Sequence, residues 1–252
     1  MKKKKRRSVY LLPNLLTSMS LFGGFYSMVA TIDKRFVSAS LAIFLSCLCD
    51  ALDGPVARKT GSASRFGVEY DSLADLVSFG VAPGLLAYMW ALKGYGRFGW
   101  LAAFLFVACG ALRLARFNVQ KDTVQKKQFL GLPIPMAAMA VASSVLFFND
   151  FVVSAEITRV FSPILMYGLA FLMVSTIRYN STKEMAFLRT RPFEAIVAAL
   201  LVAVIVLIHP SISLFVISMG YLVSGPVRYL FRRKGAPEEV PHSPHGSHTR
   251  ES

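Results

Sequence analysis

Four aspartates lie close together in an otherwise apolar chain, in the run from Asp50 to Asp75. Asp50 and Asp53 are three residues apart and Asp71 and Asp75 are four apart, so each pair shares one face of its helix if both segments are helical. Two such helices side by side would gather four carboxylates. Oxygen ligands without Cys or His suit hard divalent cations, and two Mg²⁺ or Mn²⁺ ions would balance the four charges. A two-metal carboxylate site commonly clamps phosphate oxygens during displacement reactions.

The elements that carry these aspartates are predicted to lie in a membrane. The 252 residues are 54% hydrophobic, and their mean hydropathy is +0.51. An unpaired aspartate at the bilayer centre costs about 2.5–3.5 kcal/mol, so the cluster needs ions or partners that compensate its charge. Apolar stretches of roughly 20 residues recur along the whole chain. We count eight, at about 13–31, 36–57, 69–92, 98–117, 133–149, 159–177, 192–208 and 211–231. The sequence therefore predicts an all-α membrane protein, a bundle of eight transmembrane helices that forms one domain over 13–233.

Basic residues are distributed unevenly between the two sides of this predicted bundle. The net charge is +14, and if both termini are cytoplasmic, 23 of the 28 Lys and Arg residues lie on the cytoplasmic side. This asymmetry follows the positive-inside rule and places the aspartates near the cytoplasmic face. The opening MKKKKRR predicts a basic amphipathic segment over 1–12 that lies on anionic lipid, in preference to nucleic-acid binding. The tail over 234–252 is rich in Pro, His and Ser, and we expect it to be disordered and cytoplasmic.

The aspartates belong to a longer pattern of fixed spacing. The pattern reads Asp50-x2-Asp53-Gly54-x2-Ala57-Arg58-x8-Gly67-x3-Asp71-x3-Asp75. It resembles the signature of the CDP-alcohol phosphatidyltransferases at every defined position. The resemblance implies a homodimeric enzyme of the bacterial inner membrane, with a cytoplasmic active site and two Mg²⁺ or Mn²⁺ ions. It also implies that Asp50, Asp53 and Asp71 hold one ion, that Asp50, Asp71 and Asp75 hold the other, and that Asp75 is the general base.

Residues near the aspartates are candidates for binding CDP-diacylglycerol. Gly54 and Ala57 keep the helix surface shallow, so a nucleotide can approach the backbone closely. Arg58 offers a planar fork of donors that suits a diphosphate. Ser64 can donate to a phosphate or a sugar, and Gly67 either ends the polar turn or allows close packing. Two further candidates, Asn14 and Thr17, either reach the diphosphate or cap the first span, and the resemblance favours the contact.

The acceptor alcohol depends on other segments of the chain. Residues 111–119, 129–135 and 175–183 resemble those of the membrane-embedded bacterial phosphatidylserine synthases, a branch of the same family. This resemblance implies that L-serine attacks CDP-diacylglycerol and that CMP leaves. Arg113 or Arg116, with Asn118, would then hold the serine carboxylate, unless both arginines are only anchors at a span end. The remaining candidates for the serine site are Arg178, Tyr179 and Lys183.

The residues alone leave three other functions to be considered. A phosphorylated acceptor, glycerol 3-phosphate or an inositol phosphate, would need additional cations, and the same arginines would supply them. A divalent-cation transporter would also carry acids inside the membrane. It predicts a second acidic group along the ion path, and no such group stands inside the predicted spans. A catalytically inactive scaffold would have no need of all four aspartates.

Overall fold

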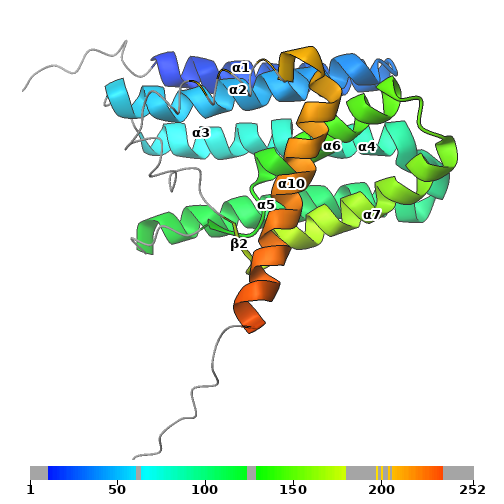
Figure 1. The fold of residues 1–252 in the computed structure, drawn as a ribbon. Coiled ribbons are helices and arrows are strands. Elements are labelled where there is room, and N and C mark those ends of the chain that lie inside the picture. The colour runs from blue at the N-terminus through cyan, green and yellow to red at the C-terminus, as the bar shows by residue number, and fades with distance from the viewer. Residues whose placement is uncertain are drawn as a thin grey trace, which may run out of the picture.

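The protein is a bundle of long helices, most of which run side by side (Figure 1). The computed structural model describes residues 11–60, 64–123, 129–179 and 206–234, with the single positions 197, 200 and 204. The elements are α1 (Leu11–Ile32), α2 (Phe36–Thr60), α3 (Arg65–Asp75), η2 (Leu76–Val81), α4 (Ala82–Ala87), η3 (Tyr88–Leu92), η4 (Lys93–Tyr95), α5 (Arg97–Thr123), β1 (Phe129–Leu130), α6 (Ile134–Asp150), α7 (Ala155–Val174), β2 (Arg178–Tyr179) and α10 (Pro210–Lys234).

Six helical segments in the described part of the chain are long and apolar enough to cross a membrane. They are Pro13–Ile32, Phe36–Val56, Arg65–Tyr95, Arg97–Val119, Ala155–Val174 and Pro210–Tyr229. These segments match six of the eight predicted spans, so the helical membrane fold is confirmed and the count of eight is not. The predicted span over 133–149 corresponds to α6, which has only 17 residues. Residues 1–10 and the tail after 234 lie outside the described residues. The predicted span over 192–208 is described only at 197, 200, 204 and 206–208.

Helix α6 lies largely inside the bundle. Eleven of its 17 residues are buried, and six of these are Ala or Ser. It packs against α2 and α10, and α10 crosses the other helices obliquely in Figure 1. Small side chains let helix backbones approach closely where the hydrophobic effect cannot drive association between helices in lipid.

The third membrane segment, Arg65–Tyr95, is one rod with a change of winding in its middle. Regular α-helix α3 ends at Asp75, and the π-helical segment η2 follows at once. Ser78, Phe79 and Gly80 of η2 are buried. Widened turns of this kind occur often beside functional sites, because they change the direction in which neighbouring side chains point. The last acidic residue of the cluster thus lies at the junction of two helix types.

Helix α1 is held against both acidic helices one turn beyond Thr17. The carbonyl oxygen of Ser20 accepts hydrogen bonds from the hydroxyls of Ser46 on α2 and Ser78 in η2, each at 3.0 Å. Gly24 lies in the same contact, where an added Cβ would come within 2.6 Å of the Cα of Ser78. This close approach fixes the distance between α1 and the two helices that carry the aspartates.

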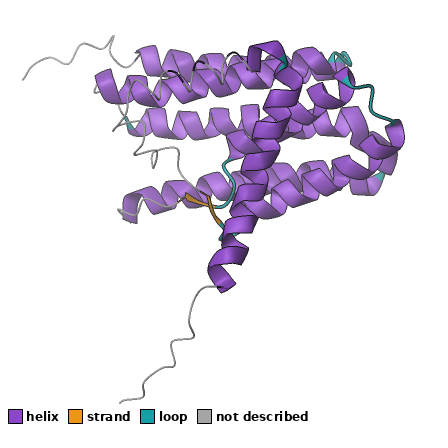
Figure 2. Cartoon of the chain, in the orientation of Figure 1, coloured by secondary structure: helices purple, strands orange, loops and turns teal. Residues whose placement is uncertain are grey.

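A short strap of β-structure follows α5 and α7. The strands β1 and β2 have two residues each and pair antiparallel, with Phe129 opposite Tyr179 (Figure 2). They are a local feature of an otherwise helical fold, as the sequence predicts. After β1 the chain turns at Gly131, whose φ is +80°. An added Cβ there would lie 2.3 Å from the Met173 carbonyl oxygen. The strap therefore joins the loop between α5 and α6 to the end of α7.

Candidate active site

The two pairs of aspartates converge between α2 and α3. Carboxylate oxygens of Asp50, Asp53 and Asp71 all lie within 4.8 Å of one another. Asp75 completes the cluster, because its carboxyl group is within hydrogen-bonding reach of Asp50. Asp53 and Asp71 are likewise within hydrogen-bonding reach across the two helices. The helical spacing read from the sequence thus brings all four side chains to one place.

Thr17 of α1 supports this cluster from the side. Its hydroxyl group lies 3.0 Å from Oδ2 of Asp53 and 3.1 Å from the carbonyl oxygen of Pro13, so both oxygens compete for one proton. Thr17 is 5% exposed and Asp53 is 8% exposed. A hydrogen bond to a charged, buried oxygen is worth about 1.5–3 kcal/mol, more than one between neutral groups. The bond therefore limits the orientations that the Asp53 carboxylate can take.

The first turn of α3 brings three more of the predicted residues together. Ser64 is the N-cap of the helix, and its Oγ accepts a hydrogen bond from the Gly67 amide at 3.0 Å. This interaction satisfies one free amide of the helix start and leaves the Ser64 hydroxyl proton available to a ligand. An added Cβ on Gly67 would lie 3.2 Å from Ser64 Oγ and 3.5 Å from Asn14 Oδ1. Asn14 of α1 therefore faces the start of α3.

Arg58 lies beside the cluster without forming an ion pair to it. An added Cβ on Gly54 would lie 3.4 Å from a terminal nitrogen of Arg58, so the guanidinium folds back over the glycine. Its charge acts on Asp53. The ion pair that the described residues contain, Arg35 with Asp33 at 3.1 Å, is elsewhere. Ala57 follows Gly54 on the same helix, and only its backbone is described.

The donor set fits a hard divalent cation. Ligands of an octahedral Mg²⁺ bind at about 2.1 Å, so opposite oxygens are about 4.2 Å apart. The three carboxylate oxygens lie within 4.8 Å of one another, so small shifts of the side chains would bring them to the distances of that geometry. Cys47, one helical turn before Asp50, directs its thiol to the Pro135 carbonyl oxygen at 3.9 Å. The group that could bind a metal thus consists of oxygens alone, as the sequence predicts.

The predicted serine-site residues occupy different environments. Arg113 on α5 is 8% exposed, its charge interacts with Asp75 and Tyr221, and its Nε has no hydrogen-bond partner among the described residues. Arg116, one turn later, instead donates to the Val174 carbonyl oxygen at the end of α7, at 3.5 Å. Arg113 therefore lies within electrostatic range of the acidic cluster, whereas Arg116 contacts the end of α7.

Asn118 and the strap residues make mainly structural contacts. The amide of Asn118 donates to Ser72 Oγ on α3 at 2.9 Å, while its Oδ1 is buried without a partner in the described chain. The ring of Tyr179 stacks on Tyr221 with centroids 5.5 Å apart, and its hydroxyl donates to the Leu222 carbonyl oxygen at 3.1 Å. Arg178 is described by its backbone alone, and Lys183 lies outside the described residues.

Comparison with known proteins places this arrangement in a family. The sequence model of the family described as CDP-alcohol phosphatidyltransferase matches residues 10–175, which include all four aspartates. The chain belongs to this family. It is therefore a membrane transferase of phospholipid biosynthesis.

Similar curated relatives occur in bacteria and archaea. A Helicobacter pylori protein named CDP-diacylglycerol–serine O-phosphatidyltransferase is 39% identical over 225 residues, 88% of this chain and 92% of the relative. A Bacillus subtilis protein of the same name is 36% identical, over 69% of this chain and 93% of the relative. An archaetidylserine synthase of Methanothermobacter thermautotrophicus is 39% identical, over 71% and 73%.

The structure adds residues to the neighbourhood of the family motif that the sequence does not reveal. Tyr221, on α10 and beyond the matched region, lies against Tyr179 and within electrostatic range of Arg113. Tyr70 on α3 shares a hydrogen bond of 2.8 Å with Ser18 on α1. Neither tyrosine stands in a recognisable motif. Each is brought to the family's site by contacts between helices distant in sequence, and no local pattern signals such contacts.

Proposed function

We propose that this CDP-alcohol phosphatidyltransferase transfers the phosphatidyl group of CDP-diacylglycerol to the hydroxyl of L-serine and releases CMP. The convergence of the four carboxylates is the observation that supports the chemistry. The names of the relatives support serine as the acceptor. The buried Arg113, which lies within electrostatic range of Asp75, gives a cation for the carboxylate that serine brings and simple alcohols lack.

In this proposal the acidic residues divide two tasks. Asp50, Asp53 and Asp71 would hold one Mg²⁺ or Mn²⁺ ion, and Asp50, Asp71 and Asp75 would hold a second. When bound, the ions stabilise the negative charge of the diphosphate as Lewis acids. Asp75 accepts the proton of the serine hydroxyl, whose oxygen forms a bond to the lipid-bearing phosphorus. The bond from that phosphorus to the CMP oxygen breaks, and CMP leaves with the electron pair.

The remaining residues bind and orient the substrates. Arg58 pairs with the diphosphate, because its charge already acts beside Asp53 and is not used in an ion pair among the described residues. Ser64 donates its free hydroxyl proton to the nucleotide, and Asn14 faces the same turn of α3. Gly54 and Ala57 leave space for the nucleotide against α2. Thr17 orients Asp53.

On the acceptor side, Arg113 binds the serine carboxylate, and Asn118, whose Oδ1 is without a partner in the described chain, receives the ammonium group. Arg116 anchors α5 to α7. Arg178 and Tyr179 of the strap border this side, and Lys183, which lies outside the described residues, is a further candidate for binding serine. We further propose eight spans, both termini and the site at the cytoplasmic face of a bacterial inner membrane, and a homodimer.

One assay tests this proposal. The purified protein is given CDP-diacylglycerol, Mn²⁺ or Mg²⁺ and one alcohol at a time: labelled serine, glycerol 3-phosphate or an inositol phosphate. Of the three alcohols, we expect only serine to give CMP release and a labelled lipid. Both products should be lost when the metal ion is chelated or when Asp71 is replaced in the Asp71→Ala variant. Turnover with a phosphorylated alcohol and none with serine would overturn the acceptor assignment. Full activity in the Asp71→Ala variant would overturn the role of the carboxylates.

A further inference from the structure

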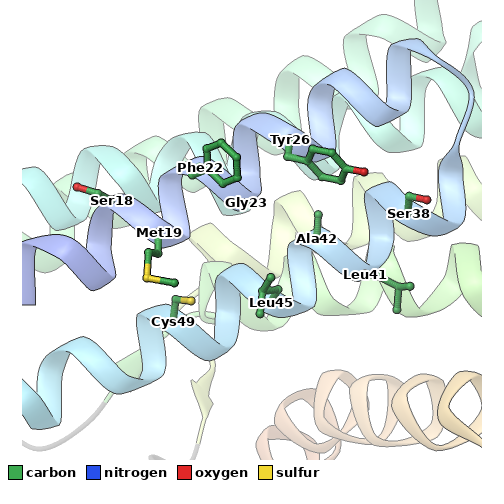
Figure 3. A pocket seen from close by; sticks show the side chains of 10 residues that line it. All are labelled: Ser18, Met19, Phe22, Gly23, Tyr26, Ser38, Leu41, Ala42, Leu45 and Cys49. Atoms are coloured by element: carbon green, nitrogen blue, oxygen red, sulfur yellow. The ribbon is translucent and has the colours of Figure 1, made fainter.

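An apolar groove runs along the outer side of the bundle between α1 and α2, and it begins beside the acidic cluster. Its volume is about 600 Å³. Ser18 and Cys49 line one end, and Tyr26 and Ser38 line the other (Figure 3). Ser18 follows Thr17, and Cys49 precedes Asp50, so the first end lies at the same level along α1 and α2 as the carboxylates. No step of the reaction proposed above uses this groove.

Close helix packing creates the groove. An added Cβ on Gly23 would lie 2.4 Å from Ser46 Oγ, so the two backbones approach closely along the floor. Ala42, also on the floor, is a buried small residue. The long side chains of Phe22 and Leu45 stand at the rim and are mostly exposed. Small residues below and large apolar residues on both sides leave a channel shaped for an extended hydrocarbon chain.

The two ends of the groove differ in chemistry. At the site end, Ser18 donates to the Asn14 carbonyl oxygen at 2.8 Å, so Tyr70 supplies the proton in its own 2.8 Å bond to Ser18. These hydroxyls form a fixed polar boundary at the level of the carboxylates. At the far end, the guanidinium of Arg35 lies 5.9 Å from the centre of the Tyr26 ring. The apolar channel is thus bounded by polar groups at both ends.

The length of the groove matches one leaflet of a bilayer. Ser18 and Tyr26 are eight residues apart, which corresponds to about 12 Å along a helix. Half of a hydrocarbon core about 30 Å thick is about 15 Å. A lipid whose phosphate reaches the carboxylates must send its acyl chains through this same leaflet. The groove is a path that begins at the site and runs in that direction.

We propose that the groove between α1 and α2 holds one acyl chain of the CDP-diacylglycerol and thereby orients the diphosphate over the acidic cluster. This inference rests on the proposed function. Lipid tails are as apolar as the groove, so little hydrophobic free energy is gained when a chain moves into it from the bilayer. The benefit is orientation, because a displacement of about 1 Å at the reacting atoms can lower a rate about 10²-fold.

A pair of matched substitutions on α2 tests the proposal. Leu41 lines the groove and is 53% exposed. Leu48 is 58% exposed and is not among the lining residues. Leu41→Trp fills the channel about two turns beyond Cys49, where a palmitoyl chain passes and a hexanoyl chain does not reach. Leu48→Trp adds the same bulk to the same helix outside the groove.

The readout is kcat/KM for dipalmitoyl and dihexanoyl CDP-diacylglycerol, measured in the full chain in mixed micelles. We expect Leu41→Trp to lower kcat/KM for the dipalmitoyl substrate about tenfold or more and to leave the dihexanoyl value unchanged. Leu48→Trp should change neither value. Equal effects of Leu41→Trp on both substrates, no effect on either, or the same pattern in Leu48→Trp would overturn the acyl-chain site.

A binding measurement keeps the groove testable if turnover fails. Dipalmitoyl CDP-diacylglycerol with a photoreactive group near the middle of one acyl chain should label peptides that contain Met19, Phe22 or Leu45. Labelling should fall in the Leu41→Trp variant and persist in Leu48→Trp. Labels spread evenly over lipid-facing helices would show ordinary bilayer contact and overturn the inference. Absence of serine-dependent CMP release with both substrates would instead overturn the proposed function, while the labelling pattern still decides the groove.

Discussion

Replacement of Thr17 by valine should weaken the metal site with little change in shape. Valine keeps the branched outline of threonine and removes the hydroxyl that lies 3.0 Å from Asp53 Oδ2. Hydrogen bonds to charged groups contribute about 1.5–3 kcal/mol, which corresponds to about 10- to 100-fold in an equilibrium constant. The same Thr17 hydroxyl also lies 3.1 Å from the Pro13 carbonyl oxygen, so its proton is shared between two acceptors. We therefore expect an effect near the lower limit, about a tenfold rise in the Mn²⁺ concentration that gives half-maximal activity.

Metal titration of serine-dependent CMP release measures this effect. Thr17→Ser should restore the normal titration, because it keeps the hydroxyl. Thr31→Val is the matched control: Thr31 is also on α1, is fully buried, and donates to the Ser27 carbonyl oxygen at 2.8 Å. Its substitution should leave the metal requirement unchanged. If Thr17→Val titrates like the unmodified protein, the bond does not orient Asp53; if both valine variants shift equally, α1 packing is the cause.

Three further predictions concern the base, the packing and the strap. Asp75→Asn should bind CDP-diacylglycerol normally in equilibrium binding while CMP release falls about 10²–10⁴-fold; an active variant would remove the base role. Gly24→Ala puts a Cβ 2.6 Å from the backbone of η2, whereas Gly168→Ala meets nothing within 4 Å. The first should cost about 1–3 kcal/mol and lower the thermal midpoint in detergent, and equal midpoints would contradict the close packing. Burial raises the pKa of Tyr179 from 10.0 to about 12, so the folded state holds this proton more tightly. Its contribution to stability is complete below pH 10 and is lost as the pH rises toward about 12. Tyr179→Phe should flatten this loss in denaturation measured across that range, and an unchanged slope would refute the assignment.

Several features of the site follow from short-range spacing and were predictable. Asp50 and Asp53 share a helix face, as do Asp71 and Asp75, because the helical period alone decides which neighbours along a helix point the same way. The short stretch 133–149 illustrates the limit of that reasoning. Its apolar composition predicts a span, but composition does not show that most of the helix is buried among other helices, as α6 is.

The acceptor side shows the same limit at single residues. Arg113 and Arg116 are one turn apart at the same span end and look equivalent in the sequence. Packing buries the first within electrostatic range of Asp75 and brings the second to the end of α7. Tyr221 reaches the same region from α10, more than 100 residues further along the chain than Arg113. No local pattern contains this information.

The sequence alone determined the membrane class of the protein, its helical segments and the identity of its acidic motif, since hydrophobicity, helical period and residue spacing are local properties of the chain. The tertiary structure decided which helix faces meet. It placed Thr17 on Asp53, brought Arg113 within electrostatic range of the cluster, and formed the groove between α1 and α2. These features depend on contacts between residues far apart in the chain, and close packing of whole helices selects such contacts.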